Sequence, residues 1–287
     1  MRDFSRGVQH LSINTATLRK QLALPAIIEA CARRGIPAID PWRDQVAAAG
    51  LAAVARQLKD AGIRLSGYCR GGFFSAADAA GLNAALEDNR RAIDEAKTLG
   101  APCLVLVVGS LPGALAGKPQ YTDIGLARSQ VRDGIAASLE YARQAGMPLA
   151  IEPLHPMQAA DRACVNTLEH ALDLCDALDP GRTGALGVAL DVYHVWWDPK
   201  LEAQIARAGA KRLLAYHVCD WLVPTRDLLN DRGMMGDGVI ELKKVRSWVE
   251  AAGYDGFAEV EIFSERWWGV PADEALDTCV TRFRSLV

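Results

Sequence analysis

Hydrophobic and polar positions along the chain follow two alternating patterns. One is a short apolar run, often preceded by glycine or proline, which is typical of a buried strand. The other is a longer stretch rich in alanine, leucine and charged residues with helical periodicity. Strands are predicted over residues 8–14, 36–40, 63–68, 103–108, 148–152, 186–191, 213–218 and 257–262. Helices are predicted over residues 20–34, 44–60, 76–99, 122–145, 167–178, 200–209, 241–252 and 271–285.

Eight strand-then-helix units without a break in composition predict an α/β protein with a single (β/α)₈ TIM barrel over residues 1–287. The length of 287 residues is close to the typical size of this barrel. A doubly wound open sheet also alternates strands and helices. However, the first predicted strand is not followed by the Gly-x-Gly-x-x-Gly turn of dinucleotide-binding folds, so we favour the barrel.

Four of the predicted strands end in an acidic or imidazole side chain: Glu152, Asp191, His217 and Glu261. Functional groups of a parallel barrel gather where its strands end, so these side chains are expected to converge. A single carboxylate there could equally be a helix cap or an ion-pair partner, but three buried acids together require a cation. Oxygen and nitrogen ligands of this kind suit Mn²⁺, Mg²⁺, Co²⁺ or Zn²⁺. Glu259 shares the strand face of Glu261, so one of the two could be an inner-layer or rim acid.

The motifs around these residues resemble the xylose-isomerase-like TIM-barrel superfamily of sugar phosphate isomerases and epimerases, and within it the inosose (keto-inositol) isomerase-like proteins. The matching segments are Ile151-Glu-Pro-Leu-His-Pro, Leu190-Asp-Val-Tyr-His, His217-Val-Cys-Asp and Val260-Glu-Ile-Phe. By position, the resemblance assigns the metal ligands to Glu152, Asp191, His217 and Glu261. It therefore selects Glu261 over Glu259.

The superfamily also contains endonuclease-IV-like proteins, which hold three zinc ions with additional histidines. Their Asp-Arg-His motif reads Asp231-Arg232-Gly233 here, and the chain has five histidines in total. With a net charge of −3 and no long basic run, nucleic acid is not expected as a partner. We therefore expect one divalent metal ion as the cofactor, and endonuclease activity is only a weak alternative.

The resemblance implies an isomerase or epimerase of a keto-sugar or inosose, in inositol catabolism or a related part of carbohydrate metabolism. Proton transfer would occur next to a metal-bound carbonyl group, with manganese as one candidate metal and Glu152 and Glu261 as the catalytic acid/base pair. Which glutamate removes the proton stays open. Elimination after the same proton transfer would instead give a dehydratase or lyase acting on an oxidised sugar or glycoside. A non-catalytic sugar-binding barrel is a weaker alternative.

Two histidines are expected to bind the small carbohydrate substrate or relay protons. His155 lies three residues after Glu152, and His194 lies three residues after Asp191, so both would enter loops above the site. The alternative for each is a loop histidine that caps a helix.

Aromatic and basic residues after strand ends complete the predicted substrate site. Trp42 and Trp196 follow predicted strands and would pack on the C–H surfaces of a sugar, unless they serve loop packing or a subunit contact. Arg43, Arg70, Arg226 and Arg232 could meet a phosphate. No glycine-rich phosphate cradle follows the seventh or eighth strand, so a non-phosphorylated substrate is favoured.

The seven cysteines show no CxxC pairing, which favours reduced thiols in the cytoplasm. The first residues lack the apolar stretch of a signal peptide, and no apolar run is long enough to span a bilayer. We therefore expect a cytoplasmic protein without a membrane partner. Because members of the superfamily are often dimers or tetramers, the resemblance also implies a homo-oligomer.

Overall fold

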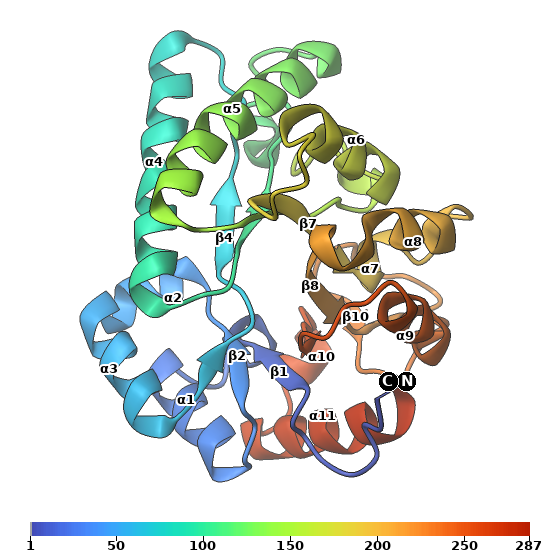
Figure 1. Ribbon diagram of the computed structural model, residues 1–287. Coiled ribbons are helices and arrows are strands. Elements are labelled where there is room, and N and C mark those ends of the chain that lie inside the picture. Colours follow the sequence, from blue (N-terminus) through green and yellow to red (C-terminus); the bar gives the residue numbers. More distant parts are fainter. Residues whose placement is uncertain (1) are drawn as a thin grey trace.

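The core of the fold is a parallel sheet that curls into a barrel, with helices on its outside (Figure 1). The computed structural model of the protein describes residues 2–287. The strands follow the order β3-β2-β1-β11-β8-β7-β6-β5-β4, which confirms the predicted barrel. Their bounds are β1 Leu11–Asn14, β2 Ala38–Asp40, β3 Arg64–Leu65, β4 Cys69–Gly72, β5 Leu104–Val107, β6 Leu149–Ile151, β7 Leu186–Asp191, β8 Leu213–Val218 and β11 Ala258–Val260.

The third position of the barrel differs from the prediction of one strand over residues 63–68. β3 pairs with β2 and β4 pairs with β5, so two short strands share this position. At the start of β4, the Cys69 N–H donates both to Pro41 O (3.2 Å) and to Asp40 Oδ1 (3.0 Å). The buried Asp40 carboxylate thus shares this backbone donor with Pro41 O, which ties the end of β2 to the start of β4.

Helices follow the strands in the predicted alternation. The predicted helix over residues 44–60 is divided in two, because Gly50 has a φ of 86° that a continuous helix cannot contain. The longer helices are α1 Leu24–Arg33, α2 Arg43–Ala49, α3 Leu51–Ala61, α4 Ala79–Leu99, α5 Ile124–Ala145, α6 Leu168–Leu178, α8 Leu201–Arg212, α9 Leu242–Ala251 and α11 Ala272–Leu286.

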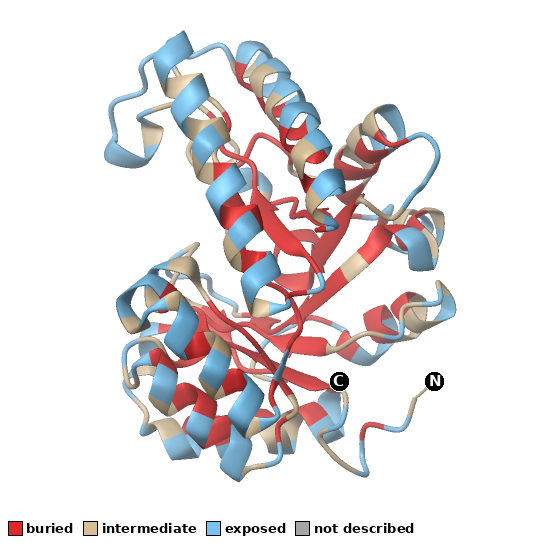
Figure 2. Cartoon of the chain, turned by 60° about the vertical axis from the view of Figure 1, so that its left-hand side comes forward, coloured by how far each residue is buried: buried red, intermediate tan, exposed pale blue. Residues whose placement is uncertain are grey.

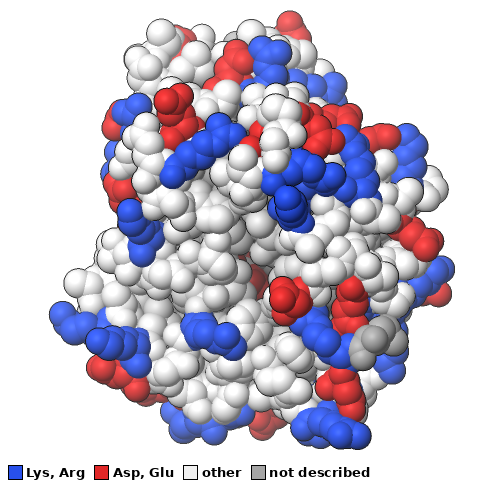
Figure 3. Space-filling view, in the orientation of Figure 1, with Lys and Arg blue, Asp and Glu red and all other residues white. Residues whose placement is uncertain are grey.

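Burial follows the layers of the barrel. The strands are buried almost throughout, and the helices expose their outer faces (Figure 2). All seven cysteines are buried and free of disulfides. No helix within residues 2–287 has both the length and the apolar character needed to cross a membrane. On the face in Figure 3, basic and acidic side chains are interspersed around the periphery, so this face has no broad area of one charge.

Short elements follow the C-terminal ends of the strands and form the rim of the barrel mouth. In the loop after β8, the carboxylate of Asp220 accepts hydrogen bonds from the N–H groups of Gly236, Gly238 and Ile240, which fixes the loop. The short elements are η1 Thr15–Leu18, η2 Ala114–Ala116, η3 Pro156–Gln158, α7 Val192–Val195, α10 Glu265–Trp268 and the hairpin β9 Asp220–Trp221 with β10 Arg232–Gly233.

Candidate metal centre

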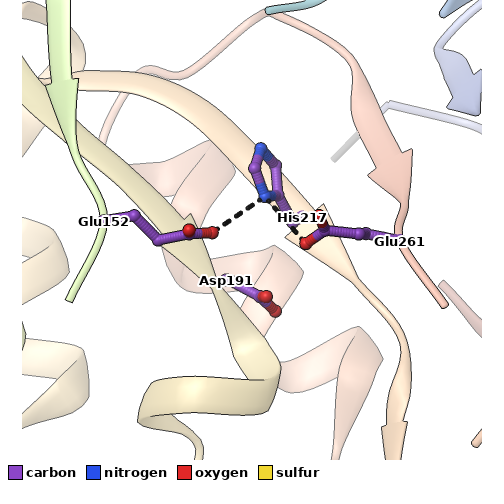
Figure 4. A group of neighbouring side chains, drawn as sticks. All are labelled: Glu152, Asp191, His217 and Glu261. Atoms are coloured by element: carbon purple, nitrogen blue, oxygen red, sulfur yellow. Dashed lines mark ion pairs between the residues drawn. The ribbon is translucent and has the colours of Figure 1, made fainter. Parts of the chain in front are cut away.

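The four residues predicted at strand ends meet inside the barrel mouth (Figure 4). Glu152 directly follows β6, Asp191 ends β7, His217 lies in β8 and Glu261 directly follows β11. One potential ligand atom from each lies within 4.8 Å of the others, and all four residues are buried. The parallel register produces this convergence, since it pairs Asp191 with His217 across β7 and β8.

Several buried polar atoms of this group lack a hydrogen-bond partner among the described residues. His217 Nδ1 lies 3.3 Å from Glu152 Oε1 and 3.5 Å from Glu261 Oε2 without a hydrogen bond to either. Glu152 Oε1 is also buried and unpartnered. Unsatisfied buried polar atoms are rare and costly. Carboxylate and imidazole atoms arranged in this way fit a divalent cation, which would satisfy them together.

Arg232 brings a positive charge against two of the carboxylates. Its Nη1 lies 2.7 Å from Asp191 Oδ2 and 3.1 Å from Glu261 Oε2. The guanidinium stacks over the ring of Tyr193 at 4.5 Å, and the backbone N–H of Arg232 donates to Phe263 O at 2.9 Å. Arg232 was predicted to contact substrate. Its position next to the acids shows a further role, which is to offset their charge.

The two glutamates of the centre have pKa values that move in opposite directions. Burial raises the pKa of Glu152 to about 7, although the nearby imidazole of His217, 3.3 Å away, opposes the rise. Burial alone would also raise the pKa of Glu261, but Arg232 and His217 outweigh it and lower that pKa to about 2. A pair of carboxylates with separated pKa values is the arrangement that acid/base chemistry uses.

A second acid lies on the other side of the His217 ring. Glu259 pairs in register with His217, and its Oε1 lies 3.6 Å from His217 Nε2. Asn14 Nδ2 donates to Glu259 Oε1 (2.8 Å), and Ser66 Oγ donates to Oε2 (2.7 Å). Glu259 therefore occupies an inner layer of the barrel, while Glu261 reaches the centre. Asp40, His217 and Glu259 form a second group with potential ligand atoms close together.

A cavity of about 230 Å³ opens beside the centre and is lined by both Glu152 and Glu261. This volume lies below the usual range of about 300–1,000 Å³ for ligand sites, so it suits only a small molecule. Of the residues predicted to bind substrate, Trp42, Arg70, His194 and Arg232 line the cavity.

His155 and Trp196 are not brought to the cavity wall. The His155 ring stacks on Trp221 with centroids 4.8 Å apart, and its Nδ1 accepts the Met157 N–H at the start of η3. Trp196 packs against Trp221 at 5.8 Å. The contacts of His155 match the alternative of a loop histidine that caps a helix, and those of Trp196 match the alternative of loop packing.

His155 also acts on its neighbour, since its backbone N–H donates to His194 Nδ1 at 3.1 Å. Burial lowers the pKa of His194 to about 3, so the imidazole beside the cavity is neutral at ordinary pH.

Several residues around the site were not singled out from the sequence. Asp40 ends a predicted strand, so the signal that identified the four ligands could also have found it. Gln158 and Arg162 line the cavity but lie in the connection after β6, where no periodic pattern indicates the direction of a side chain.

The fold and the site together define a parallel barrel with three acids and an imidazole converging at its mouth, and comparison with known proteins identifies its family. The family described as xylose isomerase-like TIM barrel matches residues 28–285, so the chain belongs to this family. The expected superfamily is thereby confirmed.

Individual relatives agree with this assignment. An inosose isomerase of Halalkalibacterium halodurans is 26% identical over 213 residues, covering 72% of this chain and 69% of the relative. A crystal structure of a protein from Sinorhizobium meliloti 1021 is 59% identical, with a TM-score of 0.92 over 97% of this chain and 98% of the other. The IOLI protein, solved with a bound zinc atom, shares the fold at 21% identity and a TM-score of 0.81, covering 97% of this chain and 98% of the other.

Proposed function

We propose that the protein is a divalent-metal-dependent isomerase or epimerase of a keto-sugar or inosose. The observation that carries the proposal is the pair of buried glutamates, Glu152 and Glu261. They approach one point from opposite sides, with Asp191 and His217 between them (Figure 4). The relatives named inosose isomerase and the zinc atom in the IOLI protein support the same chemistry.

Glu152, Asp191, His217 and Glu261 would hold the metal. When bound, a divalent cation supplies Lewis-acid chemistry, which polarises a carbonyl group and favours loss of a proton from the adjacent carbon.

The two glutamates differ in their freedom to exchange that proton. Glu152 Oε1 accepts no hydrogen bond from the described residues, and Glu152 lines the cavity. Glu261 Oε2 accepts a hydrogen bond from Arg232, which holds this carboxylate in place. We therefore assign proton removal to Glu152, whose carboxyl group can also give the proton back, and assign Glu261 to holding the metal.

The cavity wall orients the substrate and limits water. Trp42 lies edge-on to Phe263 at 5.3 Å, and its Nε1 donates to Asn14 Oδ1 at 2.8 Å, which fixes the indole. An aromatic wall of this kind suits the C–H face of a sugar. The neutral His194 imidazole lines the cavity beside Arg232, whose Nη2 lies 3.2 Å from its Nε2.

Solvent exchange tests the proposal directly. The purified protein, supplied with Mn²⁺, is incubated in D₂O with inososes and ketohexoses, and NMR follows deuterium at the carbon next to the carbonyl. We expect incorporation in the wild type and a loss of about 100-fold or more in Glu152→Gln, the typical range for a missing acid/base group. Glu241→Gln, an exposed glutamate on the outer surface, is the matched control.

The masses of the products separate isomerisation from elimination. An isomer keeps the mass of the substrate, whereas a dehydratase product loses one water. Absence of deuterium incorporation and of any new product across the panel would contradict both reactions and leave the sugar-binding alternative.

A further inference from the structure

Two arginines on the cavity wall have no acidic partner. Arg70 and Arg162 line the same cavity as Glu152 and Glu261. Within residues 2–287, neither guanidinium takes part in an ion pair or a hydrogen bond with the protein. Arg19, which also lines the cavity, is by contrast paired with Asp44.

The acids in electrostatic range of the two arginines are engaged elsewhere. Asp88 accepts hydrogen bonds from Arg43 (2.9 Å) and Arg91 (3.0 Å). Asp227 accepts the backbone N–H groups two and three residues later in its own loop. The donors of Arg70 and Arg162 are thus left for a molecule in the cavity.

The structure also holds Arg70 in place. Its guanidinium lies 4.1 Å from the centroid of the Phe73 ring. The Phe73 N–H donates to Val107 O at 2.9 Å on the neighbouring strand, which anchors the ring. Burial lowers the pKa of Arg70, and the positive charge of Arg162 also lowers it, so the two cations repel each other. An anion between them would relieve this repulsion.

The metal centre does not supply that anion. Arg232 pairs with Asp191 and Glu261, and a divalent cation held by Glu152, Asp191 and Glu261 would offset the remaining formal charge. Arg70 and Arg162 therefore add positive charge to the cavity, whose lining acids, Glu152 and Glu261, both belong to the metal centre.

We infer that the substrate carries an anionic group, a carboxylate or a phosphate ester, and that Arg70 and Arg162 bind it while the other end of the substrate meets Glu152 and Glu261. Guanidinium groups bind both kinds of anion through paired, charge-assisted hydrogen bonds. The substrate class is then an acidic or phosphorylated keto-sugar rather than a neutral one. The inference rests on the proposed function for the identity of the reacting end, but anion binding by the two arginines can be measured without turnover.

Equilibrium binding tests it by isothermal titration calorimetry on the metal-loaded protein. The probes are D-fructose, D-fructuronate and D-fructose 6-phosphate, which carry a hydroxymethyl, a carboxylate and a phosphate ester at the same carbon. We expect at least one anionic probe to bind about tenfold or more tightly than D-fructose, as charge-assisted hydrogen bonds provide. The probe with the higher affinity identifies the anion.

Three variants locate the effect. Arg70→Gln and Arg162→Gln should each remove most of the preference for the anionic probe and leave D-fructose binding nearly unchanged. Arg226→Gln removes an exposed arginine of the loop after β9 that does not line the cavity, so it should keep the preference. Thermal melting checks that each variant folds. If the loss of the Phe73 contact unfolds Arg70→Gln, Arg162→Gln still tests the preference for the anionic probe.

The inference is overturned if neither anionic probe binds more tightly than D-fructose, or if Arg226→Gln lowers the preference as much as the other two variants. Binding without deuterium exchange in any substrate would reject the proposed function and keep the anion site. Deuterium exchange on neutral substrates, without tighter binding of the anionic probes, would keep the proposed function and reject the anion site.

Discussion

Glu259 Oε1 lies 3.6 Å from Nε2 of His217, on the opposite side of the imidazole from Glu152 and Glu261. Asn14 and Ser66 hold the Glu259 carboxylate in this position. A histidine placed between a carboxylate and a metal site is oriented by that carboxylate, which also makes the opposite nitrogen a better ligand.

Replacing Glu259 by glutamine should weaken metal binding. The amide keeps the shape of the side chain but loses the charge that orients His217, so we expect about 10–100-fold lower affinity for Zn²⁺ or Mn²⁺. Metal titration against a competing chelator measures the change, and Glu241→Gln is the control at an exposed site. An unchanged dissociation constant would show that Glu259 does not position the histidine.

Removing the charge of Arg232 should destabilise the protein. Arg232→Gln leaves Asp191 and Glu261 buried without their cation, a change that typically costs about 3–5 kcal/mol. Urea unfolding of chelator-treated protein measures the loss, and Arg226→Gln provides the exposed control. A variant as stable as the wild type would mean that the acids do not depend on Arg232.

Metal binding should raise the melting temperature. A ligand present at about 1,000 times its dissociation constant stabilises the folded state by about 4 kcal/mol. Adding Zn²⁺ or Mn²⁺ should therefore shift the thermal transition upward, and chelation should reverse the shift. Asp191→Ala removes one of the four converging ligands and should lose most of the effect. A metal-dependent shift of full size in that variant would place the ion elsewhere.

A buried ion pair distant from the centre should make stability depend on acid pH. Arg212 Nη1 lies 2.8 Å from Asp179 Oδ2, and both side chains are buried. Burial alone would raise the pKa of Asp179, but hydrogen bonds from Thr183 and Arg143 and the charge of Arg212 hold it below 3.8. The stabilisation is therefore complete above pH 3.8 and is lost as the pH falls through the folded-state pKa.

Asp179→Asn should accordingly be less stable than the wild type at pH 7, and the difference should shrink as the pH is lowered below 4. Urea unfolding across this range measures both proteins, with the exposed Asp273→Asn as the control. A difference that does not change with pH would contradict the electrostatic origin.

The sequence predicts the barrel well because each strand and helix has its own periodicity. It cannot predict the depth of a side chain within the barrel, which depends on register between strands. Glu259 and Glu261 lie on one face of the same segment. The pairing of Glu259 with His217 places Glu259 beneath the imidazole and Glu261 beside it.

The residues of the connections were the least predictable. Arg162 and Gln158 reach the cavity because the chain turns after η3, and Arg232 reaches the acids because β10 pairs with β9. Neither turn leaves a periodic signal. His155 was expected at the substrate site, but local helix capping and stacking on Trp221 determine its orientation.

Glu152, Asp191 and Glu261 lie at the ends of barrel strands, whereas Arg162 and Arg232 lie on the connections that follow β6 and β8. The connection after β8 has its own internal support, because Asp220 binds three of its backbone N–H groups. Connections of this kind can change in sequence while the strands keep their register. Arg162 could therefore be lost or gained by exchanging a loop, whereas Arg70 lies in strand β4 and would have to change within the barrel itself.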